Sequence, residues 1–269
     1  MALINFSLKH PDNIIPWGDA PEMTMHWFGL TEGEYWLDLG KSTLYEYTSE
    51  VLAGDGHDAR YVEYQIVRLI EDWTSLFDAI AEPLPDAFYS IARTSNYLYR
   101  FYAAALSWLD HLSQDPLIDE DTYYNRYDKA IEWIYSRTLT AMHLTAGPGV
   151  SFFRNRDNIA IVWKADHVTE HNIPVWTAQN GEIEMAYEVF VREVADFGNR
   201  FFDAMDNQVR IALDKDWGST VINKERLKQE QQERKEAFQK KLAVLKGEPA
   251  KHTDWELVNA LLTQMFSHR

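Results

Sequence analysis

Two histidines four residues apart form the pattern in this sequence that most suggests metal chemistry. His167 and His171 enclose the segment HVTEH and match the pattern H-x-x-E-H, in which both imidazoles bind zinc from one face of a helix. A predicted strand ends just before this segment, and Pro174 follows it by three residues, so one helical turn at most could form. We therefore expect the two histidines in a surface loop, with no bound metal and no cofactor.

A run of carboxylates followed by tyrosines is the second group with chemical potential. Asp119, Glu120 and Asp121 could hold a metal ion, but acidic residues at the start of a predicted helix favour capping. Tyr123 and Tyr124 follow directly. Tyrosines beside surface carboxylates suit the anchors of a basic protein partner, although they also suit partly buried helix positions. We predict that these five residues bind a partner.

No segment carries a recognised catalytic or cofactor-binding motif. The sequence contains no Walker loop, no G-x-G-x-x-G and no G-x-S-x-G. Gly54-Asp55-Gly56 lacks the Lys-Ser/Thr that a phosphate-binding loop needs, so it predicts a turn. Carboxylates are too numerous for any two to be selected as general acid and base. We therefore predict no catalytic residue, and a binding protein ahead of an enzyme.

The composition favours a cytoplasmic globular protein. The chain has 269 residues, 46% of them hydrophobic, and no cysteine, which excludes disulfides and thiol nucleophiles and is typical of a reducing compartment. No apolar stretch approaches the roughly 18 residues of a membrane span. The first residues, MALINFSLKHPDN, show no signal-peptide pattern.

The negative charge is concentrated in the first part of the chain. Residues 1–150 hold 9 Lys+Arg against 23 Asp+Glu, a balance of 9 − 23 = −14, and residues 151–269 hold 17 − 19 = −2, which together give −16. Such a field repels nucleic acid and anionic membranes and attracts cationic partners, although it also serves solubility alone. We predict a basic protein partner, and neither nucleic acid nor a membrane.

The periodicity of apolar residues predicts an α+β fold dominated by helices. Residues 1–57 predict a small antiparallel β unit that includes two strands joined near Gly33. Residues 58–146 predict three amphipathic helices. A hairpin with a possible third strand is expected over 150–180, and the longest helix over 182–213, where Gly198 would mark a close contact.

The last part of the chain differs in character. Residues 223–246 are rich in charged residues and glutamine, which predicts an exposed or bridging helix. A final amphipathic helix follows. We predict one α+β domain over 1–215 and a helical extension over 216–269. The apolar residues available for burial in the charged helix are Leu227, Phe238, Leu242 and Leu245.

Several segments resemble an uncharacterised bacterial family catalogued only as a domain of unknown function. They are PWG at 16–18, HWFGLTEGEYWL at 26–37, YVEYQIVRLIED at 61–72, SFFRNRDNIAIVW at 151–163, VWTAQNG at 175–181 and FVREVADFGNRFFDAM at 190–205. The resemblance spans roughly residues 3–215 and implies no catalytic residues. Members look like the small acidic proteins encoded beside bacterial polymorphic toxins, which implies an immunity role.

These observations lead to one functional prediction and two alternatives. The leading prediction is an immunity protein that binds a cytosol-acting toxin, such as a nuclease or an ADP-ribosyltransferase, and occludes its active site. The first alternative is a hydrolase or metal-dependent enzyme with a cleft between the β unit and the helices. The second is a structural or regulatory module assembled through the helix at 223–246. The oligomeric state is not predicted.

Overall fold

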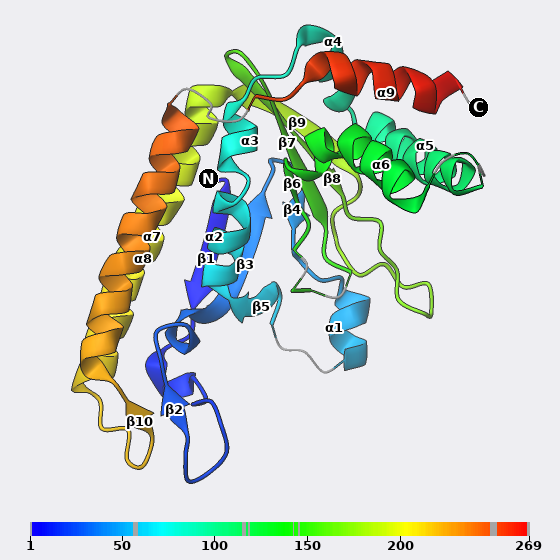
Figure 1. Ribbon diagram of the computed structural model, residues 1–269. Coiled ribbons are helices and arrows are strands. Elements are labelled where there is room, and N and C mark those ends of the chain that lie inside the picture. Colours follow the sequence, from blue (N-terminus) through cyan, green and yellow to red (C-terminus); the bar gives the residue numbers. More distant parts are fainter. Residues whose placement is uncertain are drawn as a thin grey trace.

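The computed structural model describes residues 2–55, 59–114, 117, 119–141, 143–144, 146–247 and 252–267. Helices make up about half of the chain and surround small sheets that are mostly antiparallel (Figure 1). The predicted α+β class, dominated by helices, is confirmed.

The N-terminal sheet is built on one long central strand. β3 pairs antiparallel with each of the other three strands, and its residues alternate between buried and half-buried positions, as the sequence EGEYWLD predicts. Gly33 pairs with Leu8 of β1, and a Cβ there would approach the Ser7 carbonyl oxygen to 2.2 Å. The strands are β1 (Ile4–Leu8), β3 (Glu32–Asp38), β4 (Thr43–Leu44) and β5 (Val62–Gln65).

Two local predictions for this region were wrong. The expected hairpin near Gly33 is absent, because the 3-10 turn Gly29–Thr31 leads directly into β3. β2 (Thr24–Met25) instead pairs in parallel with β10 (Val221–Ile222). The predicted turn at Gly54 lies in helix α1 (Ser49–Asp55), while Gly56 lies outside the described residues.

The three predicted helices between residues 58 and 146 are shorter and more numerous than expected. The segment predicted as the first helix begins with strand β5, because residues 62–65 pair antiparallel with β3 although Val62 also fits the helical pattern. The third ends at Tyr135, where strand β6 follows. The helices of this region are α2 (Ile66–Thr74), α3 (Phe77–Ala81), α4 (Asp86–Ala92), α5 (Ser95–Ser113) and α6 (Glu120–Tyr135).

The second sheet contains the predicted hairpin and divides the interior of the protein. Phe152 and Ile161 face one hydrophobic core, which also includes the N-terminal sheet. Phe153 and Val162 face a second core formed with α4, α5 and α6. This sheet is therefore buried on both faces. Its strands, in antiparallel order, are β6 (Thr138–Leu139), β7 (Gly149–Asn155), β8 (Asn158–Lys164) and β9 (Gly181–Ala186).

The long helix begins five residues later than predicted. Residues 182–186 belong to β9, which pairs with β8, and α7 extends over Tyr187–Asp214. Glutamate, methionine and alanine in this segment favour a helix locally, but pairing with the edge of β8 decides its conformation. The third strand expected at 174–178 is absent, and only isolated bridges form there.

The charged helix α8 (Lys224–Lys246) is neither exposed throughout nor a bridge. It packs along α7, also contacts α2 and α3, and buries all four apolar residues predicted for it (Figure 1). Gly198 allows the close approach of the two helices, because a Cβ there would lie 2.0 Å from the ring of Phe238. The close contact predicted at Gly198 is confirmed.

A buried ion pair attaches the last helix to the second core. Arg137 is fully buried and donates to the carboxylate of Glu82 at 2.6 Å. The same carboxylate accepts hydrogen bonds from the backbone and the hydroxyl of Thr253, at 2.5 and 2.6 Å. Thr253 lies two residues before the start of α9 (Trp255–Ser267), which contacts α5 and α6.

Candidate functional site

The predicted partner-binding residues lie together at the start of α6. The Asp119 carboxylate accepts from the Thr122 backbone N–H at 3.0 Å and from the Thr122 hydroxyl at 2.7 Å. These hydrogen bonds lower the pKa of Asp119. Asp119 therefore caps the helix, as its position predicts, whereas Glu120 and Asp121 are exposed.

The two tyrosines of this turn differ in exposure. Tyr124 is 46% exposed, and Tyr123 is half-buried against the second core. Their ring centroids lie 4.6 Å apart. The structure thus brings all five predicted residues into one surface turn, with Tyr124 the more available side chain for a partner.

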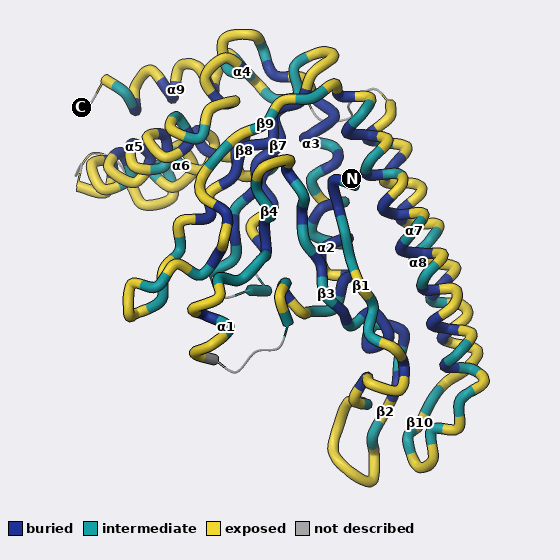
Figure 2. Tube along the Cα trace, turned by 180° about the vertical axis from the view of Figure 1, so that it is seen from behind, coloured by how far each residue is buried: buried dark blue, intermediate teal, exposed yellow. Residues whose placement is uncertain are grey.

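A larger acidic surface, which the motif analysis missed, lies on the outer face of the N-terminal sheet. The side chains of Glu32, Glu34, Trp36 and Asp38 alternate with the buried residues of β3 and share one face with Glu63 of β5. In Figure 2, β1 and β3 lie in front of α2, so this face points away from the core. We call these five residues the acidic sheet face.

The charges of the acidic sheet face are only partly compensated. Lys9 contacts the carboxylates of Glu32 and Glu63, each at 2.6 Å. Glu34 lies directly across the ladder from Glu63. Partial burial, followed by the charge of Glu63, raises the pKa of Glu34. Like charges opposite each other destabilise a sheet, so this arrangement is not explained by folding stability.

Aromatic rings lie at one end of the same face. The rings of Trp36 and Tyr61 stack with centroids 4.1 Å apart and 12° between their planes. The guanidinium of Arg60 lies 5.2 Å from the Tyr61 centroid. Alternation of polar residues along β3 was visible in the sequence, but the neighbours contributed by β5 depend on a pairing register that it does not state.

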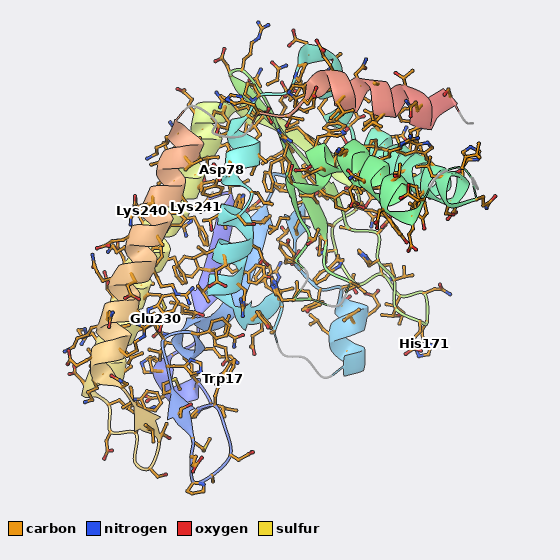
Figure 3. The ribbon with its side chains drawn as sticks, viewed as in Figure 1. Trp17, Asp78, His171, Glu230, Lys240 and Lys241 are labelled. Carbon is orange, nitrogen blue, oxygen red and sulfur yellow. The ribbon has the colours of Figure 1, made fainter. Side chains whose placement is uncertain are left out.

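The H-x-x-E-H segment lies in a loop, as predicted. His171 is exposed on a loop that projects from the body of the protein (Figure 3). His167 is half-buried, and its backbone carbonyl accepts from the Val175 N–H. Among the described residues, no group of three or more His, Asp or Glu side chains is placed to hold a metal ion.

A partly buried chain of hydrogen bonds links Tyr35, His143 and Asp72. The hydroxyl of Tyr35 lies 2.8 Å from Nε2 of His143, and Nδ1 of His143 lies 3.2 Å from the carboxylate of Asp72. Burial lowers the pKa of His143 and raises that of Tyr35. These hydrogen bonds hold β3, α2 and the loop after β6 together.

The sequence of the chain matches one known protein family. A family model described as a family of unknown function, DUF5984, matches residues 3–261, and the chain belongs to this family. The match extends beyond the resemblance noted over residues 3–215 and includes α8 and half of α9. No curated protein and no solved structure matches the chain. None of the helices in the described part of the chain is long and apolar enough to cross a membrane.

Proposed function

We propose that the protein is an immunity protein of the bacterial cytoplasm that binds a basic, cytosol-acting toxin and occludes its active site. The acidic sheet face carries this proposal. It combines four carboxylates and one compensating lysine, Lys9, with a stacked tryptophan and tyrosine. Acidic residues steer a cationic partner toward a surface, and large aromatic side chains retain it once water is excluded.

The turn at the start of α6 is the second candidate surface. Glu120, Asp121 and Tyr124 offer the same chemistry on a smaller scale. The sheet face is favoured because its like-charged pair, Glu34 and Glu63, costs stability in the free protein. A basic side chain inserted between these two carboxylates relieves that cost on binding.

The test is co-expression with a basic toxin domain encoded beside the gene, followed by binding kinetics across a salt series. We expect protection of the cells, a stable complex, and association that slows as salt rises, because screening acts beyond about 8–10 Å. Glu34→Lys with Glu63→Lys should slow association. Trp36→Ala should speed dissociation by an amount equivalent to about 1–3 kcal/mol if Trp36 is an anchor.

Two sets of control variants identify the surface. Glu256→Lys makes the same charge change per substituted residue, on the exposed side of α9, and should leave the kinetics unchanged. If Glu120→Lys and Tyr124→Ala affect binding while the sheet variants do not, the partner binds α6. Protection without a complex would favour an enzyme that reverses the toxin's modification. A protein that neither protects nor binds is not an immunity protein.

A further inference from the structure

A pocket that is separate from both acidic surfaces opens between the helices of the second core and the second sheet. It has a volume of about 300 Å³, at the lower end of the range typical of small-molecule sites. Helices α5 and α6 form one wall and strands β6, β7 and β8 the other, with the loop after β8 at one side (Figure 1). The interface site proposed above uses none of its residues.

The floor of the pocket is a cluster of hydroxyl groups. The side-chain oxygens of Thr138 and Ser151 lie 2.8 Å apart, and both residues are buried. The hydroxyl of Tyr102 interacts with both, and burial raises the pKa of Tyr102 to about 12. A neutral tyrosine and two hydroxyls can each donate and accept hydrogen bonds, so the floor suits a polar ligand group.

Aromatic rings and a lysine lie at the mouth. Tyr99 is 60% exposed and Tyr135 44% exposed, and both line the pocket, where their rings are available to a planar ligand. Lys164 also lines it, with its ammonium 5.6 Å from the Tyr99 centroid. The Nδ1 atom of His167 is buried and, within the described part of the chain, has no hydrogen-bond partner.

The charge of this pocket is opposite to that of the protein. The chain carries 42 Asp+Glu, yet no lining residue of the pocket is acidic. Two exposed carboxylates outside the pocket accept hydrogen bonds from lining residues. Asp166 accepts from the side-chain amide of Asn180 at 3.0 Å, and Glu182 accepts from the Ser95 backbone N–H at 3.0 Å. Asp166 also lies 3.6 Å from Lys164, and this pair is about half exposed at both ends, so a ligand displaces it at small cost.

From this geometry we infer that the pocket binds a small aromatic anion, with its ring between Tyr99 and Tyr135 and its anionic group at Lys164 and His167. Two classes of compound combine an aromatic ring with an anionic group, namely nucleoside monophosphates and aromatic carboxylates. The test uses both, in the form of adenosine 5′-monophosphate and 4-hydroxybenzoate. Their neutral counterparts, adenosine and 4-hydroxybenzyl alcohol, report the contribution of the charge.

Calorimetric titration of the full chain is the measurement. We expect at least one anion to bind with a Kd of about 1 mM or tighter and its neutral counterpart to bind about tenfold more weakly. The anion that binds identifies the class of compound. If neither anion binds, the inference is wrong.

Two variants and one control locate the binding. A side chain at Gly149 meets no atom within 4 Å of its Cβ, so Gly149→Leu should fill the pocket without unfolding the protein and abolish binding. Lys164→Glu should weaken it about tenfold or more, whereas Lys41→Glu, an equal charge change on an exposed turn, should not. Binding that survives both pocket variants, in proteins with unchanged melting temperature, overturns the assignment. Toxin binding is measured separately, so either proposal can fail alone.

Discussion

Glu34 lies directly opposite Glu63 across the antiparallel pairing of β3 and β5, and the nearby ammonium of Lys9 contacts Glu63 but not Glu34. The pKa of Glu34 is raised by partial burial and by the charge of Glu63. A carboxyl group with a raised folded-state pKa binds more protons when folded. Its ionisation therefore removes stability as pH rises above the unfolded value, about 4.3–4.5.

We predict that Glu34→Gln stabilises the protein at pH 7. The gain should be about 0.2–1 kcal/mol, since the variant removes a like-charged cross-strand pair. Chemical denaturation at pH 7 and pH 4 measures it, and the difference from the native protein should shrink at pH 4. Glu256→Gln, on α9, is the control and should change little. A loss of stability at pH 7 would contradict the electrostatic explanation.

His143 should make the fold sensitive to mild acid. Its folded-state pKa is lowered, chiefly by burial, although Asp72 opposes this shift and Arg68 reinforces it. The unfolded chain then binds more protons, so stability present above pH ~6.5 is lost as pH falls below that value. Tyr35 and Tyr64 also contact this ring.

The measurement for His143 is the melting temperature between pH 7.5 and 5.5. The native protein should lose more stability over this range than His143→Gln, which keeps a hydrogen-bonding side chain without a titrating ring. Asp72 and Arg68 are present in both proteins, so the difference between the two profiles isolates the imidazole. Parallel profiles would show that His143 titrates as it does in the unfolded chain.

Gly198→Ala and Gly54→Ala should have opposite effects. At Gly198 the new methyl group would lie 2.0 Å from the Phe238 ring, so α7 and α8 must separate, at a cost of about 1–3 kcal/mol. At Gly54, in α1, the methyl group meets no atom within 4 Å, and alanine should stabilise the helix by about 0.5–1 kcal/mol. Thermal unfolding of both variants tests the contact, which is refuted if Gly198→Ala is neutral.

Removing one member of the buried ion pair should be severely destabilising. Arg137→Met leaves the Glu82 carboxylate buried without its cation, at a cost of about 3–5 kcal/mol. Thr253→Val removes one hydrogen bond to the same carboxylate and should cost about 1–3 kcal/mol. Urea denaturation compares the two. If Arg137→Met proves the milder variant, the pair does not hold α9 in place as described.

The sequence correctly predicted the elements whose hydrophobic pattern matches their burial. The predictions were wrong where the local conformational preference of a segment differs from the strand pairing that it makes. α7 has one apolar face over seven turns, and the β7–β8 hairpin is apolar on both sides, so both were predictable. Residues 182–186 favour a helix locally but pair with β8. The opposition of Glu34 and Glu63 depends on a register between strands that are about thirty residues apart, which no local pattern encodes.

The candidate sites, too, could be predicted from the sequence only where they depend on local properties. Asp119 was predictable as a helix cap, and its neighbours as an exposed turn, because these properties are local. The pocket between Tyr99, Ser151 and Lys164 collects residues from helices, strands and a loop. None of these residues belongs to a recognisable catalytic or cofactor-binding motif within its own segment. Only the packing of α5 and α6 on the second sheet brings them together.

The anchoring of α9 also has a consequence for synthesis on the ribosome. Glu82 is made 171 residues before its partner Thr253, and α5 and α6 are complete long before the helix that covers them. While the intervening residues are being added, the apolar surface that Val258, Leu261 and Met265 later bury stays open. That surface is therefore covered only when residues 253–265 have emerged from the exit tunnel.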